Sequence, residues 1–381
     1  MSPVYFDHNA TTPLDEQVLA AMLPYFREHF GNPSSRHEYG REARRAVDNA
    51  REQVADALGA HPSQVIFTSG GSEANNLAIK GAAACLTPTQ LAITNIEHPC
   101  VSKAGQELAA QGWKLAKIGV STAGRIDAAA LEQVLCQPTG LVSVMLANNE
   151  TGVVQDVAAL AEIAKKHGAL MHSDAVQALG KVPLDFAALN VDLLSVSAHK
   201  AYGPKGIGAL VLNKAVEIKA LIVGAAHEKG LRAGTENVPA IVGFGVACEL
   251  AAQRVAEQAG RLRGLRDELE RGLHELGAVI FGAAAERLSN TSFFGFPGIE
   301  GETLVMALDN AGFAVASGAA CSSGSTQASA TLLAMGVENE LGRAAVRVSL
   351  GKDTTGEQVR MFLSALQGEL KRMRGLAAMA V

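Results

Sequence analysis

The chain has few cysteines and no paired arrangement among them. Its 381 residues include five, at positions 85, 100, 136, 248 and 321, and no two of these form a C-x-x-C pair. An odd and scattered set argues against a disulfide framework and against a structural zinc site. We therefore expect no intrinsic metal site, and a reducing cytoplasm as the location of the protein.

The chain also lacks a strong charge bias and a long apolar run. Charged residues make up 19% and the formal net charge is only -5, so nucleic acid is not an expected partner. Residues Met1–Thr12 carry Asp7 and His8 and lack the apolar run that a signal peptide contains. The richest apolar stretch, Val238–Cys248, is shorter than the roughly 18 residues of a membrane span, so no membrane partner is expected.

What the chain does have is 48% hydrophobic residues and a length that favours two lobes. Between about residues 64 and 213, short apolar runs bounded by polar or glycine-containing turns alternate with helical patterns. This alternation predicts an α/β domain with a mostly parallel sheet covered by helices. The runs predict strands at Val65–Thr68, Leu91–Thr94, Leu141–Ala147, Ala169–His172, Leu193–Val196 and Ala209–Leu212.

The C-terminal part has a different pattern, typical of a smaller α+β domain. A helical pattern from about Pro239 to Leu276 predicts a connector between lobes, which Gly260 is expected to break. We assign residues 14–255 to the large domain, and residues 1–13 and 256–381 to the small one. The small domain is predicted to contain helices near 301–311, 327–335 and 356–374, and strands at Val279–Phe281, Ser292–Phe296 and Val346–Leu350.

A glycine-rich turn follows the first predicted strand. Ser69-Gly70-Gly71-Ser72-Glu73 leads from this strand into a helical pattern. Ligands of open α/β sheets bind beyond the carboxyl ends of strands, and the free N–H groups of a helix N-terminus suit a phosphate. Taken alone, an ordinary strand-to-helix turn explains the same residues.

Two further strands are followed by residues with chemistry of their own. Asp174 could cap the next helix, or pair with a cationic ring nitrogen as a pyridoxal cofactor requires. Lys200 follows a buried strand, where partial desolvation suits a lysine to imine formation, although most lysines lie on the solvated surface. Each signal is weak alone. In this order at the strand ends of one sheet, they predict a pyridoxal-phosphate site.

The small domain adds a cysteine and an arginine. Cys321 lies in the Gly/Ser/Ala-rich run Ser317–Ser325, where a thiol can be accessible and mobile. Arg347 lies within the predicted strand Val346–Leu350, and a buried arginine needs a partner. A substrate carboxylate and an internal salt bridge are both candidates for that partner.

Five segments closely resemble those of the cysteine desulfurases, which are class V members of the fold-type-I pyridoxal-phosphate enzymes. The resemblance implies a PLP-transferase large domain similar to that of aspartate aminotransferase, and in the cysteine segment it favours the branch with a long flexible loop. Residues 224–228 depart from the family, because Ala225 and Ala226 replace a more glycine-rich version. The segments are Tyr5–Pro13, Phe30–Ser35, Asn148–Gly152, Ser197–Lys200 and Arg232–Thr235.

The resemblance also implies roles for individual residues. Lys200 would carry pyridoxal 5'-phosphate, Cys321 would accept the sulfur, and His98 would stack on the ring and move protons. Substrate binding would fall to Asn149, Arg347 and Asn32. The cofactor-binding residues would be Gly71, Ser72, Asn149, Asp174, Gln177, Ser197, His199, Lys200 and, from the neighbouring subunit, Thr235.

The implied protein is a homodimer that removes sulfur from L-cysteine and yields L-alanine and a persulfide on Cys321. The persulfide would pass to a sulfur acceptor such as an iron-sulfur cluster scaffold, and Cys321 could serve as a transient ligand of the cluster. An aminotransferase or selenocysteine lyase on the same scaffold is one alternative. A non-catalytic sulfur or metal carrier is another, although a carrier has no use for an imine lysine.

Overall fold

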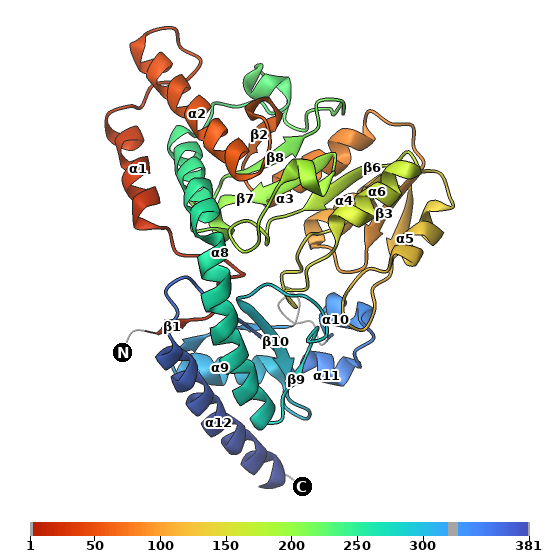
Figure 1. The fold of residues 1–381 in the computed structure, drawn as a ribbon, viewed down its shortest axis with the longest axis vertical. Coiled ribbons are helices and arrows are strands. Elements are labelled where there is room, and N and C mark those ends of the chain that lie inside the picture. Colours follow the sequence, from red (N-terminus) through yellow and green to blue (C-terminus); the bar gives the residue numbers. More distant parts are fainter. Residues whose placement is uncertain (1–2, 319–326, 380–381) are drawn as a thin grey trace.

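The central element of the fold is a seven-stranded sheet (Figure 1). The computed structural model describes residues 3–318 and 327–379. The strand order is β2-β8-β7-β6-β5-β3-β4, and every neighbouring pair is parallel except the two that involve β8. The predicted α/β domain with a mostly parallel sheet is confirmed. The strands are β2 Val65–Thr68, β3 Gln90–Thr94, β4 Lys114–Ile118, β5 Thr139–Ser143, β6 Leu170–Asp174, β7 Leu193–Ser197 and β8 Gly208–Leu212.

The six predicted strands of this sheet are present, and β4 is an addition. β5 ends at Ser143, four residues before the predicted end at Ala147. β4 lies at the edge of the sheet, and its residues Lys114 and Lys117 are exposed. Charged residues of this kind protect an edge strand from pairing with other chains, but they also remove the apolar run by which buried strands are recognised.

Helices cover both faces of the sheet because successive residues of a strand point to opposite faces. In β2, Val65 and Phe67 belong to one hydrophobic core and Ile66 belongs to another. The second core contains residues of α3 (Gly71–Asn76) and α4 (Pro99–Ala109). The first contains residues of α2 (Glu38–Ala57), α5 (Ala128–Leu135), α6 (Val157–Lys166) and α8 (Val238–Glu275).

The remaining helices of this part are short or peripheral. α1 (Glu16–Arg27) begins at Asp15, whose side chain accepts a hydrogen bond from the Gln17 backbone N–H. It packs on α8 through Val18 and Met22. α7 (Phe186–Leu189) is a single turn that ends at Asn190, in the left-handed conformation. Caps of these kinds satisfy backbone groups that a helix end leaves unpaired.

A second sheet lies below the first in Figure 1. It is antiparallel, in the order β12-β13-β10-β9, and a separate parallel pair joins β1 to β11. Its core holds Phe6, Leu304 and Phe362, together with Leu269 of α8. The boundaries at residues 14 and 255 stay a prediction. The elements are β1 Val4–Tyr5, β9 Val279–Ile280, β10 Thr291–Gly295, α9 Gly301–Asn310, β11 Phe313–Ala314, β12 Ala316–Ser317, α10 Ala330–Ala334, α11 Asn339–Arg343, β13 Ala345–Ser349 and α12 Gly356–Met379.

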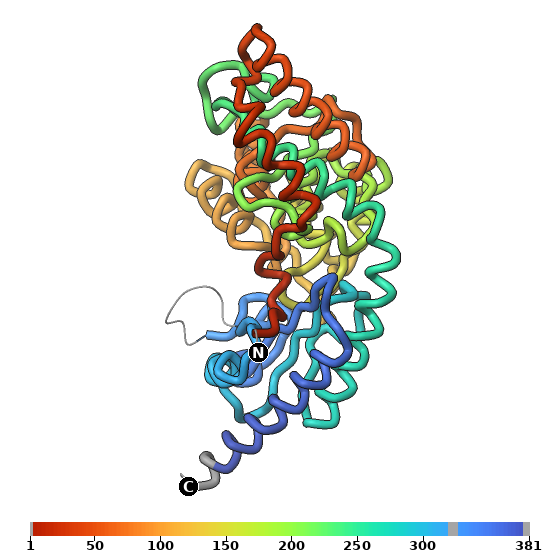
Figure 2. The backbone as a smooth tube through the Cα atoms, turned by 90° about the vertical axis from the view of Figure 1, so that its left-hand side faces the viewer, coloured from red at the N-terminus to blue at the C-terminus, as the bar shows by residue number. Residues whose placement is uncertain are grey.

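The two parts of the molecule are joined by α8 and by the N-terminal segment. Figure 2 shows the N-terminal segment running from the lower part up to α1. The prediction that α8 breaks at Gly260 is wrong, because the helix continues through this residue for 38 residues in all. By length and composition α8 could cross a membrane, with a window of mean hydropathy 1.3, but 50% of that window is buried inside the protein.

Gly260→Ala is expected to stabilise the protein by about 0.5–1 kcal/mol, because alanine costs less conformational entropy than glycine in a helix. A Cβ at Gly260 would meet no atom within 4 Å. Gly245→Ala, in the same helix, is the matched control. Its Cβ would lie 2.4 Å from Gln53 Oε1 and 2.8 Å from Ala50 Cα, so we expect destabilisation. Urea unfolding measures both, and a lower midpoint for Gly260→Ala would contradict the continuous helix.

Candidate active site

A cavity of about 640 Å³ lies where β2, β3, β5, β6 and β7 end. The carboxyl ends of parallel strands meet at one edge of a sheet, so residues that are far apart in sequence come together there. The cavity lining includes ten of the residues predicted from the sequence: Gly71, Ser72, His98, Asn149, Asp174, Gln177, Ser197, His199, Lys200 and Arg347.

Asp174 is the last residue of β6 and is 5% exposed. Its Oδ2 accepts a hydrogen bond from Asn75 Nδ2 at 2.7 Å, and its Oδ1 accepts one from the Val176 backbone N–H at 2.9 Å. Burial raises the pKa of Asp174, although the Val176 N–H and His98 act in the opposite direction. A cation bound against this carboxyl group would favour its ionised form, and a protonated ring nitrogen is such a cation.

The turn between β2 and α3 has room only for small residues. A Cβ at Gly71 would lie 2.6 Å from Val176 Cγ2, and 3.5 Å from Ser197 Cβ. Ser197 Oγ is buried and has no hydrogen-bond partner among the described residues. Because a buried hydroxyl group without a partner costs free energy, an acceptor such as a phosphate oxygen fits this position.

Lys200 lies in a short turn, Ala198–Lys200, that follows β7. Its Nζ donates hydrogen bonds to the backbone oxygens of Asn9, at 2.6 Å, and Ala10, at 2.8 Å. The N-terminal segment therefore lies directly against the lysine, which lines the cavity.

His98 is the N-cap of α4. Its Nδ1 accepts a hydrogen bond from the Cys100 backbone N–H at 3.2 Å, and Cys100 Sγ lies 2.9 Å from the same nitrogen. Burial lowers the pKa of His98, although Asp174 raises it. A neutral imidazole that accepts at Nδ1 carries its proton on Nε2, so His98 can exchange protons with a ligand only through Nε2.

Of the two partners expected for Arg347, a substrate carboxylate and an internal salt bridge, the structure contains the salt bridge. Arg347 Nη2 donates to Asp7 Oδ1 at 2.6 Å, and Nη1 donates to the Asn149 backbone oxygen at 3.0 Å. Its Nε is buried and has no hydrogen-bond partner among the described residues. Because a guanidinium group has five N–H donors, Arg347 can keep its salt bridge and still donate to an anion in the cavity.

Asn9 holds several of the predicted residues together, although the sequence did not single it out. It is 1% exposed, and its backbone oxygen accepts from Gln177 Nε2 at 2.9 Å as well as from Lys200. Its Nδ2 donates to Thr291 Oγ1 at 2.9 Å and to the Asn149 backbone oxygen at 3.2 Å. The strand-end argument could not find Asn9, because no predicted strand precedes it.

Asn32 and Thr235 are exposed and do not line this cavity, and Cys321 lies outside the described residues. The segments that carry Asn32 and Thr235 are close to each other. Arg44 Nη2 donates to Glu236 Oε1 at 2.8 Å, and Ser34 lines a second cavity, of about 400 Å³, together with residues 225–229. A single chain therefore leaves Asn32 and Thr235 on a surface away from the predicted catalytic lysine.

The replacement of glycines at Ala225 and Ala226 requires no strained backbone. Ala226 has φ of −75°, and neither alanine is among the described residues with positive φ. The left-handed conformations in this segment fall on Glu228 and Lys229, with φ of 45° and 60°. Glu228 is held by Arg51, whose Nη1 donates to its Oε2 at 2.8 Å.

Known proteins with similar sequences and structures share this architecture. The family model of aminotransferase class-V matches residues 4–362. Cysteine desulfurase 2 of Trichormus variabilis is 44% identical over 99% of this chain and 95% of its own length. The solved structure of a NifS-like protein has a TM-score of 0.92 at 39% identity, and the match covers 97% of this chain and 99% of that one.

A second solved structure, SspA in complex with cysteine, has a TM-score of 0.81 at 35% identity and covers 91% of this chain and 98% of its own. At 39% and 35% sequence identity, these two matches are more than a likeness of fold alone. The family model and the relatives extend over both sheets and over all the strand ends that line the cavity. The chain therefore belongs to the cysteine desulfurases of the aminotransferase class-V family.

Proposed function

We propose that this chain is a pyridoxal-phosphate-dependent cysteine desulfurase that transfers sulfur from L-cysteine to Cys321 and releases L-alanine. The observation that carries the proposal is the convergence of Lys200, the buried Asp174 and the unpartnered Ser197 Oγ in one cavity. Relatives named as cysteine desulfurases, and the structure of SspA with cysteine, support the choice of substrate.

The cavity offers a matching group for each part of the cofactor. Ser197, His199 and the Gly71–Ser72 turn would hold the phosphate, Asp174 the ring nitrogen and Gln177 the ring oxygen. When bound, the cofactor supplies an electron sink for negative charge at the substrate Cα.

The protein's own groups then divide the remaining work. Arg347 and Asn149 hold the substrate carboxylate, and Lys200 Nζ removes the proton from Cα. His98 moves protons through Nε2. The thiolate of Cys321 attacks the substrate sulfur, so that an S–S bond forms while the bond from sulfur to Cβ breaks, and its electron pair stays on carbon. Protonation of Cβ, followed by return of a proton to Cα, gives L-alanine and leaves a persulfide on Cys321.

The destination of the sulfur and the location of the protein are further parts of the proposal. A persulfide sulfur is electrophilic enough to pass to a second thiol, so the partner is a protein acceptor such as an iron-sulfur cluster scaffold. Exchange of this kind requires reduced thiols, which agrees with the cytoplasm expected from the cysteine pattern.

A homodimer would bring the exposed predicted residues to a cavity. Large apolar side chains are exposed beside these residues: Phe30, close to Asn32 in the chain, is 71% exposed, and Val223 is 82% exposed. Ile222, next to Val223, accepts a hydrogen bond from the Ala233 N–H of the segment that carries Thr235. Exposed apolar patches of this kind mark interfaces between proteins. In the proposed dimer this face is covered by the partner, and Thr235 of one chain reaches the phosphate site of the other.

Replacement of Lys200 tests the cofactor assignment. Wild type incubated with pyridoxal 5'-phosphate and reduced with borohydride should carry the cofactor covalently on the peptide that contains Lys200, as measured by peptide mass spectrometry. Lys200→Ala should carry none there, because it has no amine. Lys219→Ala, at an exposed lysine, is the control and should retain the label. Label on another peptide of wild type would overturn the assignment.

Replacement of Cys321 tests the sulfur transfer. Cys321→Ala should bind the cofactor and L-cysteine with the same spectral change as wild type. It should lose at least about 100-fold in sulfide released under a reductant, because the nucleophile is gone. Cys136→Ala removes an exposed free thiol elsewhere and should match wild type. Equal release of sulfide and alanine by Cys321→Ala would show that sulfur leaves without a persulfide on this residue.

Val223→Asp tests the dimer. A charge at this exposed apolar position should convert the dimer to monomer at micromolar concentration, because it would have to be buried unpaired in the interface. Light scattering after size-exclusion chromatography measures the mass. Met306→Asp, at a position in α9 that is 68% exposed, is the control and should not change it. A monomeric wild type, or a dimeric Val223→Asp, would contradict the assigned face.

A further inference from the structure

A second lysine, Lys181, contacts Gln177 and Asn9 of the active-site lining and has no role in the chemistry described above. It follows the turn after β6, where Gly180 adopts a φ of +72°, and it is partly buried. Desolvation lowers the pKa of Lys181 well below its ordinary value, and the charges of Lys200 and Arg347 lower it further. Holding a lysine at such a position costs free energy, which calls for a reason.

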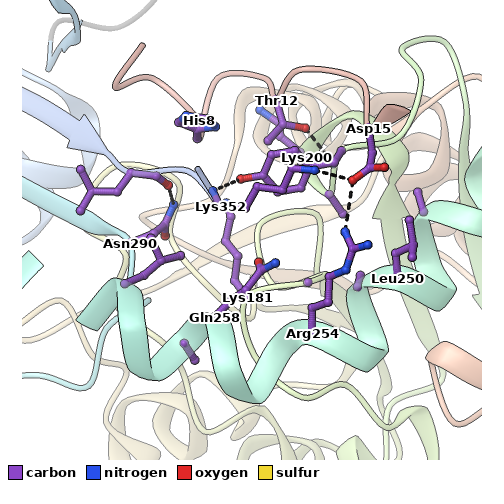
Figure 3. A pocket seen from close by; sticks show the side chains of 18 of the residues that line it. His8, Thr12, Asp15, Lys181, Lys200, Leu250, Arg254, Gln258, Asn290 and Lys352 are labelled. Atoms are coloured by element: carbon purple, nitrogen blue, oxygen red, sulfur yellow. Dashed lines mark hydrogen bonds and ion pairs between the residues drawn. The ribbon is translucent and has the colours of Figure 1, made fainter. Parts of the chain in front are cut away.

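No carboxylate among the described residues forms an ion pair with Lys181. A small cavity of about 40 Å³ lies next to it, lined also by His8, Lys200 and Asn290 (Figure 3). Asp15 is the only acidic residue in that lining, and it is already paired with Lys352 and Arg254. A counter-charge therefore does not explain Lys181.

The position of Lys181 is explained by its hydrogen bonds. Lys181 Nζ donates to Gln177 Oε1 at 2.6 Å and to Asn9 Oδ1 at 2.9 Å. A neutral amine keeps two N–H donors, so both bonds are available in either protonation state. The two acceptors are themselves buried, with Gln177 5% and Asn9 1% exposed.

The contacts with Lys181 and with the Asn9 backbone oxygen both fix which way the Gln177 amide faces. Lys181 Nζ donates to the amide oxygen of Gln177, so the amide nitrogen lies on the other side. That nitrogen donates one hydrogen to the Asn9 backbone oxygen at 2.9 Å. Its second N–H has no acceptor among the described residues, and Gln177 lines the active-site cavity. Without Lys181, only the hydrogen bond to the Asn9 backbone oxygen would hold the amide in this orientation.

We propose that Lys181 is a positioning residue, which holds the Gln177 amide so that it donates a hydrogen bond to the group bound in the active-site cavity. The same contact fixes Asn9, whose backbone oxygen receives Lys200. The inference rests on the proposed function, because it takes the bound group to be the cofactor, whose ring oxygen accepts the bond.

A double-mutant cycle on the holoenzyme tests this inference. Lys181→Met and Gln177→Met each remove the polar groups and keep an unbranched side chain of similar length. The measurements are the dissociation constant of pyridoxal 5'-phosphate from the reconstituted protein and the visible absorbance spectrum of the bound cofactor. Lys166→Met, at an exposed lysine in α6, is the control for loss of a positive charge.

We expect Lys181→Met to raise the dissociation constant by about tenfold, the scale of one lost charge-assisted hydrogen bond, and to shift the spectrum. Lys166→Met should do neither. Since Lys181 acts through Gln177, the double variant should bind the cofactor within about twofold of Gln177→Met alone. The inference would be overturned if the fold-changes of the two single variants multiplied in the double variant. It would also be overturned if Lys181→Met bound the cofactor as wild type does, with the same spectrum.

Two further measurements keep the outcome interpretable. If Lys181→Met does not fold, as judged by circular dichroism, Lys181→Leu replaces it in the cycle, because it also removes the N–H donors. Alanine produced from L-cysteine by wild type tests the proposed function separately. If wild type binds the cofactor and forms no alanine, the proposed function fails, and the cycle still decides the role of Lys181.

Discussion

The hydrogen bonds of Asn9 join the parts of the molecule that must meet for the cavity to exist. Its backbone oxygen accepts from Lys200 and Gln177, on the side of the large sheet. Its side chain donates to Thr291 of β10, and its backbone N–H donates to Ser349 Oγ of β13, on the side of the small sheet. Buried polar groups that share one residue must all be satisfied together, so the lysine and the small sheet cannot shift independently.

Several positive charges lie close together near Asn9. Lys181, Lys200 and Arg347 lie near one another, and their mutual repulsion contributes to the lowered pKa of Lys181. Elsewhere in the cavity lining, burial raises the pKa of Asp174 and lowers that of His98. A bound cation would offset the raised pKa of Asp174, and an anionic substrate carboxylate would offset the positive charge near Arg347. Perturbed groups gathered in a cleft are typical of functional sites.

Much of the site could be predicted because it follows strand ends. Asp174, Ser197 and Lys200 lie at or just after buried apolar runs, which are easy to recognise, and parallel strands bring those ends together. The elements that were missed give weaker patterns. β4 carries exposed lysines at a sheet edge, and β12 has only two residues. Gly260 suggested a break, but a helix as long as α8 tolerates one glycine whose Cβ position is open.

Other features depend on contacts between distant segments, which no local pattern contains. Arg347 could be identified as a buried arginine in need of a partner, but only the folded chain shows that Asp7 takes part of its guanidinium and leaves Nε. The positions of Asn32 and Thr235 on an outer face likewise appear only once the chain is folded.

The sequence by itself determined six strands of the large sheet, its mostly parallel arrangement and the residues at its strand ends, because these follow from the periodicity of apolar residues and the chemistry of single side chains. Tertiary structure alone decided the rest. The backbone oxygen of Asn9 accepts hydrogen bonds from Lys200 and Gln177, which lie 191 and 168 positions further along the chain. Such contacts depend on distances in space, which spacing along the chain does not specify.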